Sequence, residues 1–225
     1  MREMSKAVVR WGADRRYVTR YLVGNGMDIG AGNDPLAQYW ELFPLITGCR
    51  PWDTAYGDGD GATLEGVPDN SLDFLVSAHC LEHVNSPMEA LANWLRVVKP
   101  EGHVIIIVPD EDRYEQGVWP STHNGDHKFT FTVAKRIRSW SPVSRNLIDL
   151  IGAHREAEIL KIEVLDAQHL YGVPRVDQTM GIGEGAIEVI LRKRPQGELD
   201  AGGRLPPPKV TDLLTERLTK TMGDV

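Results

Sequence analysis

The sequence has few cysteines, no excess of basic residues and no long apolar run. Two cysteines, Cys49 and Cys80, occur among 225 residues. They are too few for a disulfide scaffold and lack a metal-ligand spacing, so we interpret them as buried thiols in a reducing compartment. No apolar stretch approaches the roughly 20 residues of a membrane-spanning helix, and the first residues contain no apolar signal-peptide core. We therefore expect a cytoplasmic protein without a membrane span.

Charge and length limit the classes of function. Lysines and arginines number 25 against 32 aspartates and glutamates, which gives a formal net charge of -7 at pH 7. Because binding to nucleic acid needs a basic surface that neutralises phosphates, this balance argues against nucleic acid as the main partner. A small or neutral substrate remains compatible with it. The length suffices for one domain with a substantial core and a short appendage.

Short apolar runs alternate with longer helical patterns, which favours a parallel sheet with crossover helices. The clearest run, residues 103–108 (HVIIIV), is continuous and β-branched and is followed by Pro109. This pattern is expected of a strand that is buried on both faces. The other strand candidates are residues 27–29, about 50–53, 72–77, 158–165 and 186–191.

A helix is predicted between the strand candidates at 72–77 and 103–108. Ser86 is a suitable N-cap, Pro87 occupies the first helical position, and Glu89 completes a capping box. Apolar residues then recur at helical spacing before Pro100, namely Met88, Leu91, Ala92, Leu95 and Val98. We interpret this stripe as core packing and not as a ligand site.

Three segments lack regular periodicity. Residues 110–131 are polar, aromatic and histidine-bearing, and they are too many for an ordinary connector, so we expect a lid-like functional insertion. Residues 175–185 form a second, glycine-rich irregular insertion. Beyond Arg194, proline, glycine and charged residues dominate, which predicts a linker and a short amphipathic helix at 210–222. The expected organisation is a domain of residues 1–194 and a tail of residues 195–225.

The stretch at residues 24–36 (GNGMDIGAGNDPL) joins a strand candidate to a glycine turn. Closely spaced glycines after a strand let the backbone approach a ligand. A dinucleotide site would need a third glycine after Gly30 and Gly32, and Asp28 and Asp34 would repel a pyrophosphate. The two carboxylates suit a ligand with a positive charge, such as an ammonium or a sulfonium. A plain tight turn and a nicotinamide-dependent oxidoreductase remain as alternatives.

Further acidic residues follow the second strand candidate. An acid about 20–25 residues beyond a glycine turn can accept hydrogen bonds from both ribose hydroxyls, and Asp53 has this position. Asp60 can accept from an adenine amino group while the backbone of Gly61 closes on the ring. For Asp58 we favour the simpler interpretation of a solvated acid in a turn. The positions of Asp53 and Asp60 fit one ligand together.

Three segments in this order, DIGAGNDP, GDGDGATLEGVPDNSLDFLVSAHCLEHV and LRVVKPEGHVIIIVPD, resemble class I S-adenosylmethionine-dependent methyltransferases, in particular the type 11-like group. The resemblance spans roughly residues 26–108. It implies a Rossmann-like α/β fold with a seven-stranded, mostly parallel sheet, helices on both faces and an antiparallel last strand. The length and proline content of residues 34–53 depart from the family pattern and leave the end of the second strand open.

The resemblance also implies S-adenosylmethionine as the cofactor. Eight residues match the family's cofactor-binding positions. Those for the methionine portion are Asp28, Gly30 and Gly32, those for the ribose and the adenine are Asp53, Asp60 and Gly61, and those that pass beneath the cofactor are Ala78 and His79.

A narrower likeness concerns residues 109–132 (PDEDRYEQGVWPSTHNGDHKFTFT). This segment resembles one in bacterial methyltransferases associated with surface-polysaccharide and glycan biosynthesis. The likeness suggests a sugar or a nucleotide-linked sugar as the small-molecule acceptor, by association and not by chemistry.

The candidate catalytic residues come from the segment after the strand at 103–108. In an open parallel sheet the acceptor lies beyond the carboxyl ends of the strands, which places residues from Asp110 onward at the reacting centre. A hydroxyl acceptor needs a base, and His127 or His123 can serve, because imidazole titrates near neutrality. Either histidine can instead anchor the lid or lie at the surface. A divalent metal on His123, Asp126, His127 and Asp110 is an alternative, but the spacing matches no strong signature, so we assign no metal site.

The sequence thus predicts a methyltransferase that acts on a small polar acceptor, most simply by O-methylation of a sugar hydroxyl. N-methylation of a small amine is the nearest alternative, because an unprotonated amine needs no base. A non-catalytic subunit that binds the cofactor is another. The tail could dock on a second copy of the chain, as in a homodimer. His83, in the LEHV stretch, is interpreted as a residue that caps or packs a helix.

Overall fold

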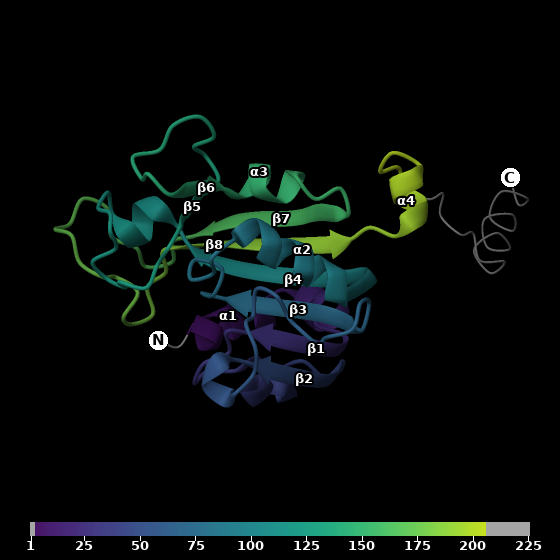
Figure 1. Ribbon diagram of the computed structural model, residues 1–225. Helices are drawn as coiled ribbons and strands as arrows, with labels where there is room; N and C mark the ends of the chain where they lie inside the picture. Colours follow the sequence, from purple (N-terminus) through teal and green to yellow (C-terminus); the bar gives the residue numbers. More distant parts are fainter. Residues whose placement is uncertain (1–2, 206–225) are drawn as a thin grey trace, which may run out of the picture. The chain divides into compact units, whose positions relative to one another are not determined.

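The computed structural model describes residues 3–205, and its centre is a six-stranded sheet in the order β2-β1-β3-β4-β8-β7 (Figure 1). β2, β1, β3 and β4 pair in parallel, whereas β8 runs antiparallel to both of its neighbours. The expected Rossmann-like α/β fold and its antiparallel last strand are therefore confirmed. In chain order the strands are β1 (Gly24–Ile29), β2 (Ile46–Trp52), β3 (Leu72–Ala78), β4 (Val98–Pro109), β7 (Ala157–Leu165) and β8 (Ala186–Lys193).

Within the described residues the main sheet has six strands, not the seven that the resemblance implied. The chain between β2 and β3 would have to supply the additional strand. Instead it forms the short 3-10 helix η3 (Thr54–Tyr56) and a succession of turns. Glycine and proline weaken strands and favour turns, and this segment contains Gly57, Gly59, Gly61, Gly66 and Pro68. β2 consequently remains the edge strand.

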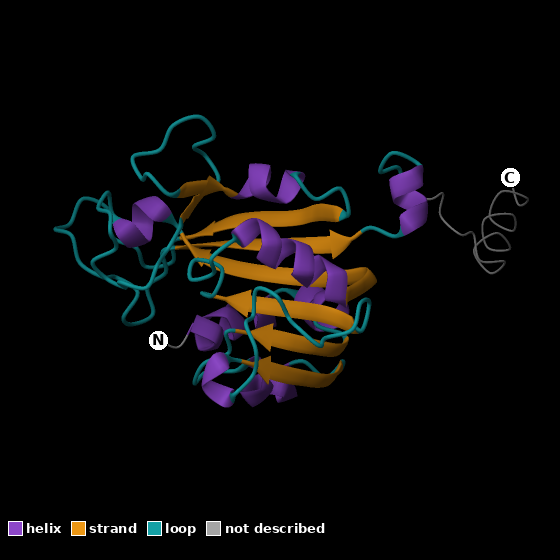
Figure 2. Cartoon of the chain, in the orientation of Figure 1, coloured by secondary structure: helices purple, strands orange, loops and turns teal. Residues whose placement is uncertain are grey.

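Helices cover both faces of the sheet (Figure 2). One core cluster joins the sheet to two helices, α2 (Pro87–Val97) and α3 (Leu147–Gly152). The other cluster joins it to α1 (Glu3–Ala13) and the short helices η1 (Tyr17–Tyr21) and η2 (Leu36–Leu42).

Strand β4 shows how the two cores follow from the sequence. Its side chains alternate in direction, so that Val104 and Ile106 belong to one core cluster and Ile105 and Ile107 to the other. A strand that is covered on both sides needs apolar residues at every position. The strand predicted at residues 103–108 is confirmed on this ground.

Helix α2 begins as predicted and buries a different stripe. The hydroxyl of Ser86 accepts a hydrogen bond from the backbone N–H of Glu89 at 3.2 Å. The buried residues are Pro87, Ala90, Leu91, Trp94, Leu95 and Val97. Met88 and Ala92, which we placed in the stripe, face solvent, because the helix turns toward the sheet the side that carries Ala90 and Trp94. The predicted stripe was wrong at these two positions.

The segment after β4 is ordered around a buried glutamate. It contains the π-helix η4 (Glu111–Glu115) and a small parallel sheet of β5 (Thr130–Thr132) and β6 (Ser144–Asn146). The buried carboxylate of Glu111 accepts hydrogen bonds from four side chains, those of Thr130, Lys135, Ser139 and Ser144. This network ties η4 to both short strands.

The chain divides at Arg194 into two compact units, and the second contains α4 (Gln196–Asp200). The division of function between a catalytic domain and a tail remains a prediction, and the helix predicted at 210–222 lies outside the described residues. Both cysteines are free and half-buried. Among residues 3–205, no helix is both long and apolar enough to cross a membrane.

Candidate active site

Two adjoining cavities lie at the carboxyl ends of the parallel strands. The first has a volume of about 160 Å³ and lies between the turn after β1, the end of β3 and helix η4. The second, of about 380 Å³, lies between the ends of β2 and β3. Gly30, His79 and His83 line both cavities. All eight residues that we expect to bind the cofactor line one cavity or the other, and their roles remain a prediction.

The glycine turn is shaped by its two glycines and by Asp53. Gly30 and Gly32 have φ angles of +71° and +49°, in the left-handed region that favours glycine. A Cβ atom at Gly30 would lie 2.7 Å from the Cβ atom of Cys80. The N–H of Gly32 donates to the carboxylate of Asp53 at 3.0 Å. The turn thus brings bare backbone to the boundary between the two cavities.

Asp28, the last polar residue of β1, is buried in the wall of the first cavity. Its carboxylate accepts one hydrogen bond, from the N–H of Leu36 at 2.7 Å. Burial, together with the charges of Asp34 and Asp53, raises the pKa of Asp28 to about 7 despite this hydrogen bond. A cationic group in the cavity would favour the ionised form.

The second cavity contains the residues predicted for the ribose and the adenine. Asp53 directly follows β2, which resolves the open strand boundary. One carboxylate oxygen of Asp60 accepts a hydrogen bond from the N–H of Ala62 at 2.8 Å. The indole N–H of Trp94 donates a hydrogen bond to the carbonyl of Gly61 at 2.7 Å. Asp58 instead pairs with the exposed guanidinium of Arg50 at 2.6 Å and accepts the backbone N–H of Asp53 at 3.1 Å; its interpretation as a solvated turn acid remains a prediction.

Ala78 ends β3 in the wall of the first cavity, and His79, which follows it, lines both cavities. His79 has a φ of +55°, a strained backbone for a residue with a side chain. Its N–H donates to the carbonyl of Ile107 at 2.9 Å, so the strained turn is fixed to β4. Burial lowers the pKa of His79, but contact with Glu82 and the charges of Glu82 and Glu3 outweigh it and leave the pKa above its usual value.

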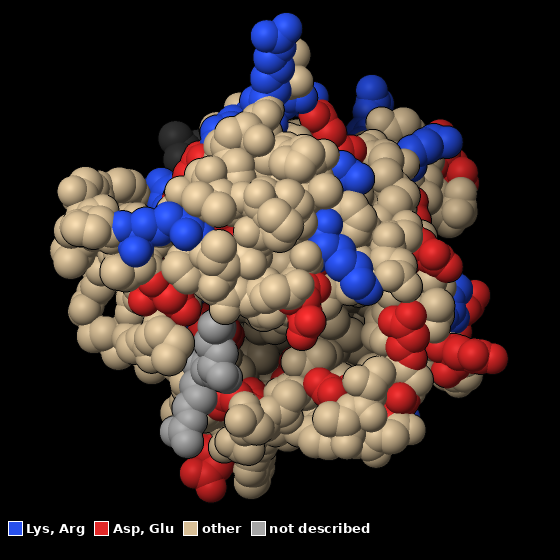
Figure 3. Space-filling view, turned by 60° about the vertical axis from the view of Figure 1, so that its left-hand side comes forward, with Lys and Arg blue, Asp and Glu red and all other residues tan. Residues whose placement is uncertain are grey.

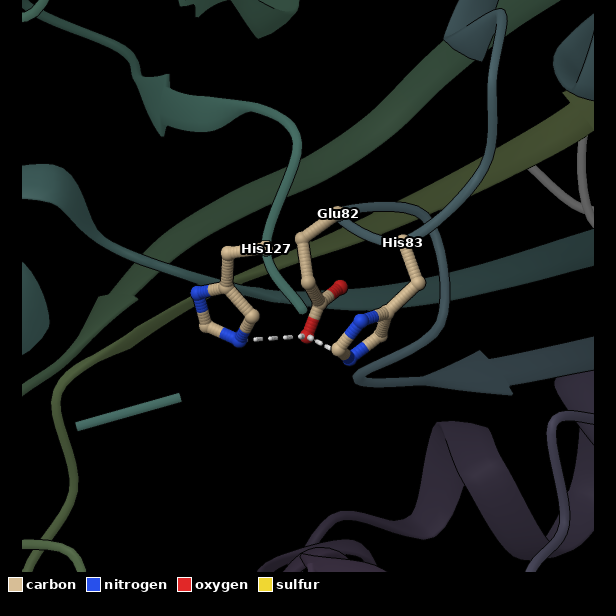
Figure 4. Close-up of side chains that lie close together, drawn as sticks. All are labelled: Glu82, His83 and His127. Atoms are coloured by element: carbon tan, nitrogen blue, oxygen red, sulfur yellow. Dashed lines mark ion pairs between the residues drawn. The ribbon is translucent and has the colours of Figure 1, made fainter. Parts of the chain in front are cut away.

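His127 is the only one of the three candidate catalytic residues, all of them described, that lines the first cavity. Its Nδ1 atom lies 2.7 Å from a carboxylate oxygen of Glu115, and both side chains are buried. Its Nε2 atom lies 4.0 Å from Glu82 (Figure 4). A buried carboxylate therefore orients the imidazole, as the general-base hypothesis requires.

His123 and Asp110 lie elsewhere. The ring of His123 meets the edge of Tyr114 at 5.7 Å between centroids and lines neither cavity. Asp110 caps η4: one of its oxygens accepts the N–H groups of Asp112 and Arg113 and the guanidinium of Arg113, at 3.0–3.1 Å. Burial raises the pKa of Asp110 although the charge and hydrogen bonds of Arg113 lower it.

Sequence analysis missed Glu82, Glu115 and the contribution of His83. Glu82 is fully buried in the wall of the first cavity, with His79, His83 and His127 around its carboxylate at 3.4–4.0 Å. Burial raises the pKa of Glu82, but contact with His79 and the charges of all three imidazoles lower it below its usual range. The signal for Glu82 and His83 was their place in the loop after a parallel strand, which ends at Ala78, at the edge of the sheet where ligands bind.

The first cavity is acidic. Glu3, Asp28, Asp34 and Glu82 all line it, and Figure 3 shows a hollow in this side of the molecule with acidic side chains around it. Such a cavity favours cations and disfavours a pyrophosphate. The carboxylates that the sequence placed at the glycine turn are therefore part of a larger group.

A protein-family model described as a methyltransferase domain matches residues 27–106. The matched stretch begins in β1 and ends in β4, so it includes the glycine turn and Glu82. A comparison with curated proteins found no match.

Solved structures of methyltransferases share the fold. An S-adenosylmethionine-dependent methyltransferase of Archaeoglobus fulgidus is 18% identical, with a TM-score of 0.56 over 86% of this chain and 95% of that one. One of Thermotoga maritima is 19% identical, with a TM-score of 0.53 over 85% and 90%. A chain of the complex between the Haloferax volcanii Trm112 methyltransferase activator and a putative methyltransferase is 14% identical. Its TM-score is 0.58 over 86% of this chain and 94% of that one. At these identities the likeness shows the fold.

The matched domain indicates a methyltransferase, and the fold is the one that S-adenosylmethionine-dependent methyltransferases share. The three solved structures are not described as acting on a sugar or a polysaccharide.

Proposed function

We propose that this protein transfers the methyl group of S-adenosylmethionine to a hydroxyl of a small polar acceptor, such as a sugar or a nucleotide-linked sugar. One observation carries the proposal: the acidic cavity beside the glycine turn also contains a buried imidazole, His127, that a carboxylate orients. A binding site for a cationic donor and a base for the acceptor thus share one wall.

The cofactor would span both cavities. Its ammonium group would lie near Asp28 and its methionine chain along Gly30 and Gly32, in the acidic first cavity. Its ribose and adenine would lie in the second cavity, against Asp53 and Asp60. The sulfonium of the cofactor would lie near Gly30, which lines both cavities.

The acceptor would bind in the first cavity at His127. When bound, S-adenosylmethionine would supply the methyl group to the hydroxyl oxygen, and its sulfur would keep the electrons of the broken carbon–sulfur bond in S-adenosylhomocysteine. The hydroxyl proton passes to Nε2 of His127, because Nδ1 is engaged by Glu115. The main task of the remaining residues is to align donor and acceptor and to exclude water.

A third cavity has the charge to bind an anionic group, and it adjoins the second cavity but shares no lining residue with the first, where the acceptor hydroxyl would lie. It has a volume of about 600 Å³ and meets the second cavity at Asn85. Basic side chains line it, namely Lys135, Arg136, Arg138 and Arg145. Arginines of this kind suit phosphate oxygens.

N-methylation of an amine is a second candidate. The acidic rim of the first cavity, with Glu3 and Asp34 beside Asp28, would attract a protonated amine. Such an acceptor needs to lose a proton before it reacts but needs no base at the moment of transfer. The two candidates therefore differ in their dependence on His127.

Calorimetry with S-adenosylhomocysteine tests the cofactor half of the proposal. We expect Gly30→Ala to abolish binding, because the new Cβ atom would meet Cys80 in the cavity wall. Gly66→Ala is a matched control, since Gly66 has a φ of +80° and open space around it. Wild-type affinity in both Gly30→Ala and Asp28→Asn would contradict the proposal.

Methyl transfer tests the acceptor half. We expect mass spectrometry to detect a methylated product among nucleotide-linked sugars, hydroxy acids and amines. His127→Gln should slow O-methylation by about 10²–10⁴-fold with cofactor affinity unchanged, and His154→Gln, outside the cavities, should not. Full activity of His127→Gln on an amine would favour the second candidate, and on a hydroxyl would refute the assignment of the base.

A further inference from the structure

A buried carboxylate in the first cavity has no hydrogen-bond partner. The side chain of Glu82 is fully buried, and neither of its oxygens makes a hydrogen bond. Buried polar groups are ordinarily hydrogen-bonded, and buried charges are ordinarily paired or bound to a metal. The carboxylate of Glu82 has an ion-pair partner, the imidazole of His79, but its hydrogen-bonding capacity is unused.

Three imidazole nitrogens lie near Oε1 of Glu82, and the nearest is Nδ1 of His79 at 3.4 Å. The Nε2 atom of His83 lies 3.9 Å from Oε1 and that of His127 lies 4.0 Å from it (Figure 4). Both distances exceed the ~3.2 Å limit of a good hydrogen bond. An ion with ligand bonds of about 2.0–2.2 Å holds two ligand atoms up to about 4.4 Å apart. Since the three ligand atoms lie within 4.8 Å of one another, a small shift brings all of them within reach of one ion.

The outer hydrogen bonds of both imidazoles fix their tautomers. Nδ1 of His127 lies 2.7 Å from the carboxylate of Glu115, and Nδ1 of His83 lies 3.2 Å from the backbone carbonyl of Asp126. A carboxylate and a carbonyl only accept hydrogen bonds, so both Nδ1 atoms donate. In a neutral ring the lone pair is then on Nε2, directed at Glu82. Metal-ligating histidines are held in this way by a carboxylate or a carbonyl.

We propose that Glu82, His83 and His127 bind a divalent transition-metal ion, of which Zn²⁺ is the representative. Imidazole ligands favour zinc, iron, nickel and copper over magnesium and calcium. The further carboxylates of the cavity, those of Glu3, Asp28 and Asp34, offset the positive charge of an ion near a cationic cofactor. Two histidines and one carboxylate leave coordination positions open toward the first cavity.

The ion would take an oxygen ligand from the acceptor, such as a hydroxy acid or a diol. This role, unlike the binding of the ion, rests on the proposed function. Nε2 of His127 has one lone pair, so it cannot bind the ion and accept a proton at the same time. With the ion in place, the metal and not His127 would lower the pKa of the acceptor hydroxyl.

These ligands differ from the set considered from the sequence. Asp126 contributes its backbone carbonyl to His83, Asp110 caps η4, and His123 lies against Tyr114. Only His127 is common to both sets. Substitution of His123 therefore distinguishes the two.

Metal titration of the full-length, tag-free protein, stripped with a chelator, tests the proposal. We expect Zn²⁺ to bind with 1:1 stoichiometry by calorimetry and Co²⁺ to give visible absorption bands of an imidazole-bound ion. Glu82→Gln and His83→Gln should each weaken Zn²⁺ binding by roughly 100-fold or more, because even a residue that only orients a ligand contributes 10–100-fold. His123→Gln and His154→Gln should bind as the wild type does.

Circular dichroism of each variant establishes that it is folded. Absence of Co²⁺ bands in the wild type, or undiminished affinity in folded Glu82→Gln, would overturn the proposal. Binding of S-adenosylhomocysteine to the same stripped protein is measured in parallel. If it binds while Zn²⁺ does not, the metal site fails and the proposed function stands; if neither binds, both fail.

Discussion

Two fully buried glutamates lie near the carboxyl edge of the sheet, and they differ in their partners. Glu111 accepts hydrogen bonds from a lysine and three hydroxyl groups. Glu82 accepts none through its carboxylate and is surrounded by imidazoles. A satisfied carboxylate stabilises the fold, whereas an unsatisfied one is retained at a cost to stability and points to function. On this basis we interpret Glu111, in the segment after β4, as a structural residue and Glu82 as a functional one.

Asp28 lies between these extremes. It is buried, it accepts one hydrogen bond, and its pKa is raised to about 7. A single N–H does not compensate for burial, so the carboxyl is poised to respond to a cation. The number of donors around each buried acid thus ranks the three from structural to functional.

The same substitution at the two glutamates should give the largest contrast. We expect Glu111→Gln to lower the free energy of unfolding by roughly 3 kcal/mol, because it removes the buried charge that pairs with Lys135 and replaces one acceptor oxygen by an NH2 group among buried hydroxyl donors. Glu82→Gln should cost less, about 1 kcal/mol, since it removes the ion pair with His79 but no hydrogen bond. Urea denaturation of the metal-free proteins measures both values. Equal losses would remove the distinction on which the comparison depends.

Glu115, whose carboxylate orients His127, should contribute to the affinity for the ion and little to the stability of the fold. We expect Glu115→Gln to weaken Zn²⁺ binding by about 10–100-fold, since the amide orients the imidazole less well than a carboxylate. Calorimetry on the stripped protein gives the affinity. Glu65→Gln, an exposed position, is the control. Unchanged affinity in Glu115→Gln would show that this hydrogen bond does not support a metal ligand.

Cofactor affinity should depend on pH through Asp28. Its folded-state pKa of about 7 lies above the ordinary 3.8, so the folded protein holds a proton there that the unfolded chain has lost. The ligand-free protein should therefore lose stability as the pH rises from about 4 to 7. A cofactor ammonium needs the ionised carboxylate, so affinity for S-adenosylhomocysteine should rise about tenfold between pH 6 and 8. A profile that Asp28→Asn leaves unaltered would assign the titration to another group.

An exposed ion pair should show the smallest effect. Arg136 pairs with Asp149 on the surface, and the two side chains are 62% and 44% exposed. Surface pairs of this kind contribute little because water screens them. We expect Arg136→Ala to unfold at the same denaturant concentration as the wild type. A clear loss of stability would mean that burial is not what ranks the carboxylates of this protein.

Much of the fold follows from local patterns. The HVIIIV run was predictable as a strand covered on both faces, because five consecutive β-branched apolar residues follow His103. The Ser-Pro-x-Glu start of α2 provides its own acceptor for the N–H of Glu89. The missing seventh strand was not predicted, because the resemblance supplied a count that the glycine-rich residues after β2 cannot realise. The exposure of Met88 was also missed, since spacing fixes a helical face but not which face meets the sheet.

The candidate site divides in the same way. By itself the sequence placed Asp28, Gly30, Gly32, Asp53 and Asp60 at strand ends and turns, because each lies within a few residues of an element that positions it. Only the tertiary structure decided the partners of Glu82, His83 and His127. Glu82 and His127 are 45 positions apart in the chain and meet because η4 and the loop after it fold back over the end of β3. The burial of these side chains, the number of donors around each carboxylate and the direction of each imidazole lone pair depend on this tertiary contact. No local sequence pattern encodes them.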